Sequence, residues 1–257
     1  MGRYEQIVEM WKNRHVVSAK DIDSALYNFR ILFAYNSGKI ENDGVTYHDT
    51  REIFENGRAV GFTGDPRALF ELGNQKLCYE FLKRKITSRE PLTIDLVLET
   101  HAALAGGTYD ERRYVERGER PGAFKINDYM IGREEAGSPP ESVRGDIAEL
   151  LDEMNGFRGE DIIKAAAYFH CKFENIHPFA DGNGRVGRTL LNYFLMTRDF
   201  PPLIVHEDER AGYYAALESF DRDSDISPMR AFLSAQLERT WEKTLQMERA
   251  NTDSFQE

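Results

Sequence analysis

A segment that is apolar on nearly every side constrains the fold of this chain most. Residues 160–175 read EDIIKAAAYFHCKFEN, and the middle of this segment lacks an extended polar face. Such a pattern is typical of a helix buried at the centre of a bundle. The helix has to end just before Pro178, because proline disfavours helical backbone in the residue that precedes it. A second helical pattern begins near Gly184 and stops before Pro201, so the sequence predicts two core helices joined by a short loop.

Helical periodicity also dominates the rest of the chain. Four further apolar stripes predict helices that begin near Asp23, Thr93, Ser138 and Ser227. The first of these is expected to run to about residue 42, where an Asp-Gly pair stops it. Residues 124–132, FKINDYMIG, are predicted to form a β-hairpin. The chain is therefore predicted to be mainly α.

The composition argues against several classes of partner. With 33 Lys and Arg against 44 Asp and Glu, the net charge is −11, which disfavours nucleic acid as the main partner. The first ten residues lack the apolar region of a signal peptide, and apolar stretches fall far short of the roughly 20 residues that span a bilayer. Two cysteines, Cys78 and Cys171, cannot form a disulfide framework. These features predict a reduced, cytoplasmic enzyme or regulator that binds neither nucleic acid nor membrane.

The loop between the two core helices carries the chemistry. Its glycines lead into a helix N-terminus, where unpaired backbone N–H groups and the helix dipole attract anions. Arg185 and Arg188 are three residues apart and share one helix face, so their guanidinium groups suit two phosphates. Asp181 offers an oxygen ligand for Mg²⁺, and His177 is a candidate general base. Together these residues favour a phosphoryl or nucleotidyl transfer site.

Simpler interpretations of the same residues have to be weighed. Residues 182–187 match G-x-G-x-x-G, but a dinucleotide site needs a preceding strand, and a helix precedes this segment. Taken singly, His177 is more often a core histidine, Asp181 a turn residue and Arg188 half of a surface ion pair. Their joint spacing favours a site over these separate interpretations.

Residues 177–188 read HPFADGNGRVGR, which resembles the Fic-family signature HPFx[DE]GNGRxxR at every defined position. The flanking FHCKFENI and TLLNYFL are also similar to the Fic core, and the resemblance covers roughly residues 90–225. It implies the mainly α Fic fold, a helical bundle around a central buried helix with one β-hairpin flap, here at 120–136. An N-terminal helical region at 1–89 and a C-terminal helix and tail at 226–257 lie outside this core.

The resemblance also implies an activity, protein AMPylation, in which AMP moves from ATP to a Ser, Thr or Tyr hydroxyl of a target protein or of the enzyme itself. Mg²⁺ is the implied cofactor and ATP the co-substrate. The Doc branch, which transfers a terminal phosphate, has lysine where this chain has Gly184, so adenylyl transfer is favoured; phosphocholine and UMP transfer stay open. Phe179 is expected to be a core anchor. The implied roles are proton acceptance by His177, Mg²⁺ ligation by Asp181, α-phosphate binding by Gly182, Asn183 and Gly184, β-phosphate binding by Arg185 and γ-phosphate binding by Arg188.

A second motif lies far upstream. Residues 37–42, SGKIEN, resemble the inhibitory [ST]xxxE[GN] motif of Fic proteins with an N-terminal inhibitory helix, here expected at about 23–42. Ser37 and Glu41 are four residues apart and share one helix face. Glu41 is expected to occupy Arg188 and keep ATP from seating its γ-phosphate. The ordinary alternative is a solvated helix end.

Three functional alternatives remain open from the sequence. The same Glu41 could orient water for removal of AMP, so the enzyme could be a de-AMPylase or bifunctional. A module that senses ATP and transfers nothing belongs to another class, and the intact His177 counts against it. The terminal helices could also serve dimerisation, which leaves a homodimer open.

Overall fold

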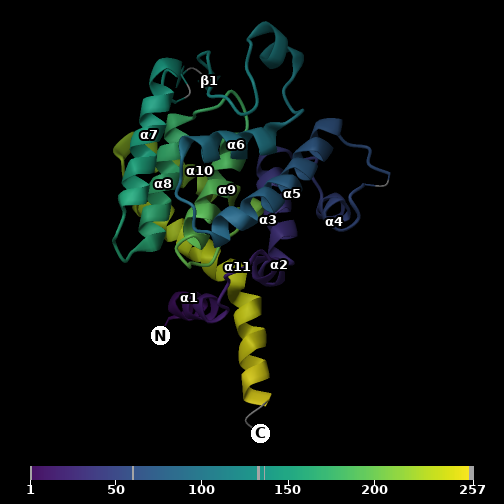
Figure 1. Cartoon of the computed structure of the whole chain (residues 1–257), viewed down its shortest axis with the longest axis vertical. Helices are drawn as coiled ribbons and strands as arrows, with labels where there is room; N and C mark the ends of the chain where they lie inside the picture. Colours follow the sequence, from purple (N-terminus) through teal and green to yellow (C-terminus); the bar gives the residue numbers. More distant parts are fainter. Residues whose placement is uncertain (1, 60, 132–133, 136, 255–257) are drawn as a thin grey trace.

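The structure, a computed structural model, describes residues 2–59, 61–131, 134–135 and 137–254. Within these residues the chain is built almost entirely from helices (Figure 1). In chain order they are α1 (Arg3–Asn13), α2 (Ala19–Ala25), α3 (Phe29–Glu41), α4 (Tyr47–Asn56), α5 (Pro66–Thr87), α6 (Ile94–Ala105), α7 (Pro140–Gly156), α8 (Ile162–Ile176), α9 (Asn183–Met196), α10 (Arg210–Asp223) and α11 (Ser227–Ser254). Short helical turns lie at Arg112–Glu116 and Glu207–Glu209.

The two predicted core helices, α8 and α9, form the centre of the bundle (Figure 1). Phe169, His170, Cys171 and Phe173 of α8 are all fully buried, which confirms that this helix has no wide solvent-facing side. The helices α3, α5 and α6 pack against α9, whereas α7, α10 and α11 pack against α8. The loop that joins α8 to α9 therefore lies within reach of helices from the N-terminal region.

Most of the predicted helices are present, and one is broken. Thr93 begins α6 as expected, because its side chain accepts a hydrogen bond from the Leu96 N–H at 3.1 Å. The helix predicted from Asp23 to about 42 is two helices instead, since α2 ends at Ala25 and the chain turns before α3 begins at Phe29. Leu26 at this turn is 1% exposed. Because Leu26 is buried like the apolar residues of a helix, the apolar pattern continues through this turn and does not indicate it.

The hairpin predicted at 124–132 is wrong in its bounds. The described strands are β1 (Met130–Ile131) and β2 (Glu134–Glu135), which pair antiparallel with Met130 opposite Glu135. Upstream of them, the chain wraps around the buried carboxylate of Glu119 instead of pairing as a strand. Glu119 accepts hydrogen bonds from the backbone N–H groups of Ile126 and Asn127 at 3.2 Å each. The buried Glu119 carboxylate thus accepts from backbone N–H groups that would donate to a neighbouring strand in a hairpin.

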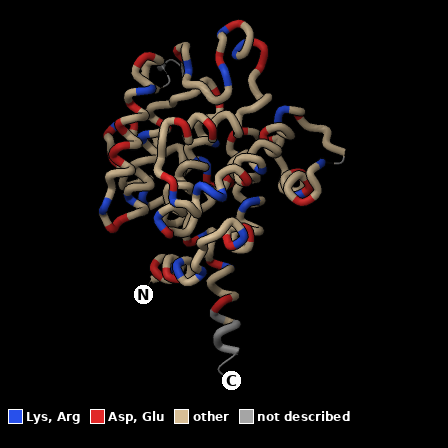
Figure 2. The backbone as a smooth tube through the Cα atoms, viewed as in Figure 1, with Lys and Arg blue, Asp and Glu red and all other residues tan. Residues whose placement is uncertain are grey.

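The outer surface carries both signs of charge. Acidic and basic residues are interspersed along the outer helices in the view of Figure 2. The helix α1 packs against α11, and the C-terminal part of α11 extends away from the body of the molecule (Figure 1). Among the described residues, no helix combines the length and the apolar character needed to cross a membrane.

Candidate active site

The loop between α8 and α9 is shaped by two left-handed residues. The helix α8 ends at Ile176, as predicted, and His177 follows in a left-handed conformation with φ 49°; its N–H donates to the Phe173 carbonyl at 3.1 Å. Gly182, with φ 82°, caps the N-terminus of α9. Glycine suits this position because it adopts positive φ without steric cost. The first N–H groups of α9 therefore face the loop without acceptors in their own helix, as at any helix start.

Phe179 anchors the loop by packing against a buried histidine. Its side chain is fully buried and stacks on the imidazole of His101 in α6, with ring centroids 3.7 Å apart. The Nδ1 atom of His101 accepts a hydrogen bond from the Gly122 N–H at 2.9 Å, so Nε2 carries the proton and donates to the Asp181 carbonyl at 3.2 Å. Burial lowers the pKa of His101 to about 3, so this ring stays neutral. Phe179 is thus a core anchor, as expected, whereas sequence reasoning missed His101.

Asn183 fixes the opposite turn of the loop. Its side-chain Oδ1 accepts from the Phe179 N–H at 2.8 Å, and its Nδ2 donates to the Phe179 carbonyl at 2.8 Å. The residue is 3% exposed. The side chain that the resemblance assigns to the α-phosphate is therefore engaged in shaping the loop, and its phosphate-binding role stays a prediction.

His177 lies where the flap segment meets the loop. The Lys125 N–H donates to the Pro178 carbonyl and the Ser138 N–H donates to the Ile176 carbonyl, both at 2.9 Å. Each neighbour of His177 is thereby attached to one end of the segment between residues 125 and 138. Burial, aided by the positive charge of Lys125, lowers the pKa of His177 below its ordinary value. The imidazole is therefore neutral at pH 7 and can accept a proton.

Gly137 makes this attachment sterically feasible. It adopts φ 78°, and a Cβ at this position would overlap the Ile176 carbonyl and lie 2.5 Å from the Cβ of His177. Only glycine brings the flap this close to the candidate base. Sequence reasoning did not single out Gly137.

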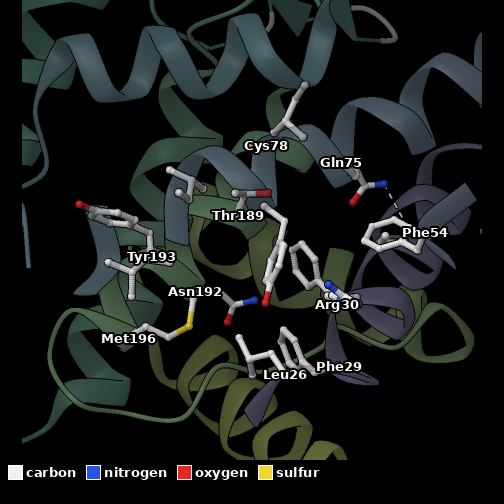
Figure 3. A pocket seen from close by; sticks show the side chains of 16 residues that line it. Leu26, Phe29, Arg30, Phe54, Gln75, Cys78, Thr189, Asn192, Tyr193 and Met196 are labelled. Carbon is white, nitrogen blue, oxygen red and sulfur yellow. Dashed lines mark hydrogen bonds between the residues drawn. The ribbon is translucent and has the colours of Figure 1, made fainter. Parts of the chain in front are cut away.

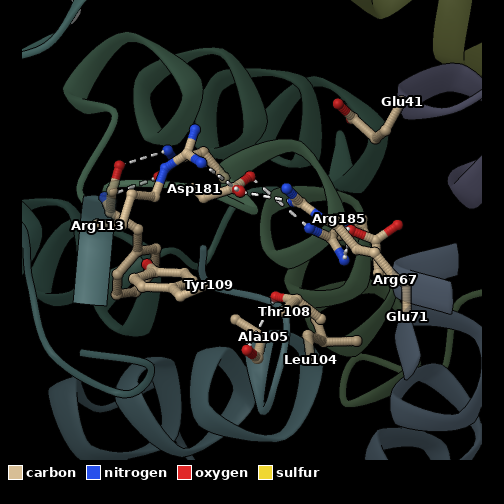
Figure 4. Close-up of polar contacts among 12 residues, drawn as sticks. Glu41, Arg67, Glu71, Leu104, Ala105, Thr108, Tyr109, Arg113, Asp181 and Arg185 are labelled. Carbon is tan, nitrogen blue, oxygen red and sulfur yellow. Dashed lines mark hydrogen bonds and ion pairs between the residues drawn. The ribbon is translucent and has the colours of Figure 1, made fainter. Parts of the chain in front are cut away.

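Asp181 is surrounded by guanidinium groups. Its Oδ2 accepts from Nη2 of Arg67 at 2.6 Å, while Arg113 and Arg185 each lie 3.8 Å from a carboxylate oxygen (Figure 4). Burial opposes ionisation, but the positive charges of Arg185, Arg67 and Arg113 outweigh it and hold the pKa of Asp181 below its ordinary value. The carboxylate is thus charged and already paired.

The donor set around Asp181 does not fit Mg²⁺ while Arg67 is in place. Magnesium is often held by one or two carboxylates together with substrate phosphates. Here Oδ2 of Asp181 is bonded to Arg67, and the groups near the carboxylate are the cations Arg113 and Arg185. The described residues contain no cluster of three or more His, Cys, Asp or Glu side chains that could hold a metal ion.

Arg185 pairs with a glutamate that sequence reasoning missed. Its Nη1 lies 3.1 Å from Oε1 of Glu71 in α5, and both side chains are buried, at 3% and 5% exposure. Glu71 also accepts from Nε of Arg67 at 2.8 Å (Figure 4). No pattern in the sequence around α5 indicates that it reaches this loop.

Arg188 meets both residues of the upstream motif. Its Nη2 donates to Oε1 of Glu41 at 2.7 Å and to the Ser37 carbonyl at 3.1 Å, and its Nε donates to the Ser37 Oγ at 3.1 Å. The Arg188 side chain is 2% exposed. The structure thus brings Ser37 and Glu41 of α3 to the arginine that the resemblance assigns to the γ-phosphate. The ordinary alternative, a helix end that contacts only solvent, does not fit these contacts, although the Glu41 side chain is 37% exposed.

A cavity lies beside α3. It has a volume of about 50 Å³ and separates parts of α3, α5 and α9, with a predominantly apolar lining that includes Phe29, Gln75, Cys78 and Thr189 (Figure 3). Close packing normally leaves few such voids. This cavity borders the part of α3 that precedes Ser37 and Glu41.

A second carboxyl group lies close to Arg188. One oxygen of Glu174 is buried without a hydrogen-bond partner, and burial raises the pKa of Glu174 to about 8 although Arg188 opposes this shift. A Cβ at Gly187 would overlap the same oxygen, so glycine there leaves room for it. Glu174 is therefore largely protonated at neutral pH and does not compete with Glu41 for Arg188.

The comparisons with known proteins agree with this geometry. The sequence pattern described as the Fic/DOC family matches residues 91–195, which include α8, α9 and the loop between them. The chain is a Fic-domain protein. Protein adenylyltransferase Fic of Drosophila persimilis is 30% identical over 213 residues, covering 80% of this chain and 39% of the relative. Protein adenylyltransferase fic-1 of Caenorhabditis briggsae is 32% identical over 190 residues, covering 72% of this chain and 36% of the relative.

This chain thus spans less than two-fifths of the length of these curated relatives. Among solved structures, a Fic-domain signalling protein from Bacteroides thetaiotaomicron superimposes with a TM-score of 0.80 at 22% identity, over 97% of both chains. Fic-1 from C. elegans superimposes with a TM-score of 0.75 at 25% identity, over 93% of this chain and 69% of that one. The mainly α Fic fold is therefore confirmed beyond the matched segment.

Proposed function

We propose that this Fic-domain protein is a protein adenylyltransferase that moves AMP from ATP to a hydroxyl side chain of a protein. The observation that carries the proposal is a neutral, half-buried His177 at the start of the loop that leads into the N-terminus of α9, with Arg185 and Arg188 on the first turns of that helix. A neutral imidazole can take the proton of an attacking hydroxyl, and the helix start with two arginines can hold a polyphosphate. The names of the curated relatives support this choice of reaction.

In this proposal the residues act as a unit. His177 takes the proton from the target hydroxyl as the oxygen attacks the α-phosphorus, and pyrophosphate leaves. The first N–H groups of α9, including that of Gly184, face the negative charge that develops on the phosphate. Arg185 and Arg188 bind the departing phosphates, and Phe179 with His101 and Asn183 keeps the loop in shape. Lys125 and Ser138 bond to the residues on either side of His177, and an extended target segment could add beside them.

The proposal includes inhibition by α3. In the structure Glu41 takes the guanidinium that would bind the γ-phosphate, and Ser37 takes two more of its donors. ATP cannot use Arg188 until these contacts break. We therefore propose that the arrangement in the structure is a low-activity state.

Label transfer from ATP tests the reaction. Glu41→Gly is incubated with ATP labelled at the α-phosphate or at the γ-phosphate, and label on protein is measured. Adenylyl transfer predicts α label but not γ label, and a further His177→Ala change should lower the rate by about 10²–10⁴-fold, the usual effect of losing a general base. Transfer of γ label would indicate phosphate transfer, and binding of ATP without any transfer would indicate a sensor; either result would overturn the proposal.

A further inference from the structure

The short helical turn Glu207–Glu209 contacts α3 directly beside the residues that bind Arg188. In the middle of α3, the Oδ1 atom of Asn36 accepts a hydrogen bond from the Glu207 N–H at 3.0 Å. The hydroxyl of Tyr35 donates to Oε1 of Glu207 at 3.3 Å. Two consecutive residues of α3 therefore bind the first residue of this turn.

The contact made by Asn36 is specific and shielded from water. The residue is 5% exposed, and its Nδ2 donates to the Leu32 carbonyl at 2.8 Å, so both ends of the amide are bonded. The N–H of Glu207 belongs to the first residue of its turn and has no acceptor within that turn, as at any helix start. Asn36 supplies the acceptor. Both bonds of the Asn36 side chain go elsewhere than to the active-site loop, so we expect it to act on the site through the position of α3.

The turn itself is fixed on another side by α11. Gln236 of α11 is fully buried; its Oε1 accepts from the His206 N–H at 3.0 Å, and its Nε2 donates to Glu209 at 2.9 Å. Arg239, one helical turn further along α11, lies 2.8 Å from Asp208 and 2.6 Å from Glu209. The turn therefore connects α3 to a helix that packs against the central α8.

We propose that Asn36 is a positioning residue whose bond to the Glu207–Glu209 turn keeps α3 in the inhibitory position. While this bond holds, Ser37 and Glu41 stay on Arg188; when it breaks, α3 can move and release the guanidinium. The inference rests on the proposed function, because release of inhibition is measured as AMP transfer. It adds a restraint from the region that follows α9 to the contacts that α3 makes with Arg188.

Asn36→Leu tests this in two backgrounds. Leucine has the same branched shape and favours a helix more than asparagine does, so α3 itself is not weakened, while the Glu207 N–H loses its acceptor. The initial rate of α-label transfer should rise about tenfold in an otherwise wild-type chain. On the Glu41→Gly background, where Arg188 is already released, the same change should add less than about twofold. A role in stability alone would lower the rate in both backgrounds.

Two further variants keep the test decisive if Asn36→Leu folds poorly. Tyr35→Phe removes only the hydroxyl that contacts Glu207, and should raise the wild-type rate about twofold without changing that of Glu41→Gly. The matched control is Asn155→Leu in α7, whose amide bonds the Leu92 N–H and carbonyl at 3.1 and 2.7 Å. This control should lower the unfolding temperature without raising the rate.

Amide hydrogen exchange of α3 is measured on the same proteins. Exchange over residues 29–41 should be faster in Asn36→Leu and unchanged in Asn155→Leu. Unchanged exchange, or a rate no higher than wild type while Glu41→Gly does transfer label, would overturn the proposal, as would an equal gain on the Glu41→Gly background. A Glu41→Gly chain that transfers no label would overturn the proposed function instead, and exchange would still show whether Asn36 holds α3.

Discussion

The guanidinium of Arg188 lies 2.7 Å from the carboxylate of Glu41, although the two residues are 147 positions apart in the sequence. Ser37, one helical turn before Glu41, contacts the same guanidinium through its hydroxyl and its carbonyl. A buried arginine with this set of partners has few donors left for a phosphate. An anion that takes Nε and Nη2 of Arg188 must therefore displace the end of α3.

Ser37→Ala should release the active site only weakly. The change removes the Oγ contact with Arg188 but leaves the backbone carbonyl contact and the ion pair with Glu41. The lost bond joins the charged guanidinium to a neutral hydroxyl while the other two contacts remain, so we expect a net loss of about 1 kcal/mol and a rise in AMP transfer of roughly fivefold. The initial rate of α-label transfer measures this. Ser24→Ala on α2, whose hydroxyl bonds only its own helix in the structure, should leave the rate unchanged; a larger rise than with Glu41→Gly would contradict the assigned order.

Gly38→Ala should strengthen inhibition. Gly38 is helical and a Cβ there would meet its nearest atoms at 3.5 Å, which is ordinary contact. Alanine favours a helix over glycine by up to about 1 kcal/mol, so α3 should be more stable and AMP transfer slower. Thermal unfolding and transfer rate are measured together. Gly145→Ala in α7, where a Cβ meets nothing within 4 Å, should raise the unfolding temperature without lowering the rate. Faster transfer by Gly38→Ala would count against inhibition by a well-formed α3.

Gly137→Ala should lower AMP transfer by disturbing His177. The added methyl would overlap the Ile176 carbonyl and press on the His177 side chain, so the flap or the base must shift. Gly57→Ala is the matched control, because Gly57 has a similar φ of 70° but open space around its Cβ position. Both variants carry backbone strain, and only Gly137→Ala meets the site. Equal transfer rates in the two variants, measured on the Glu41→Gly background, would show that the flap contact does not position His177.

Glu174 should make stability depend on pH. Its pKa is about 8 in the folded protein against an ordinary 4.5, because burial favours the neutral acid. The folded state then binds more protons than the unfolded state between these values. The stability from this group is thus complete below pH 4.5 and declines as pH rises to about 8. Glu174→Gln should remove that decline, so the variant should gain unfolding temperature over wild type between pH 5 and 8.5. Parallel curves for the two proteins would contradict a buried, protonated Glu174.

Most of the features that were predicted from the sequence lie in one continuous stretch of the chain. The loop from His177 to Arg188 and the core helices on either side are continuous in the chain, so local spacing was enough to place them. The pairing of Glu41 with Arg188 was predicted through a family resemblance, and the structure confirms that the two residues meet. How α3 approaches α9 was not predicted, because the break at Leu26 depends on packing.

The rest of the site depends on long-range contacts. His101 lies 80 positions from Asp181, and Arg67 lies 114 positions from it, with no local pattern that marks either residue. The hairpin was misplaced for a similar reason, since the buried Glu119 takes the backbone donors of Ile126 and Asn127, which lie in the predicted hairpin. Contacts between buried polar residues that are far apart in the chain cannot be predicted from local patterns in a single sequence.

The initial rate of AMP transfer by Glu41→Gly relative to wild type, at saturating ATP and Mg²⁺, is the decisive test of inhibition by α3. Loss of a charge-assisted hydrogen bond of roughly 1.5–3 kcal/mol predicts a rise of about 10- to 150-fold. Asp43→Gly, which removes an exposed acid two residues further on, should match wild type, and Glu41→Gly/Arg188→Ala should lose the gain because the phosphate contact is gone as well. A Glu41→Gly variant no faster than wild type would contradict inhibition by Glu41.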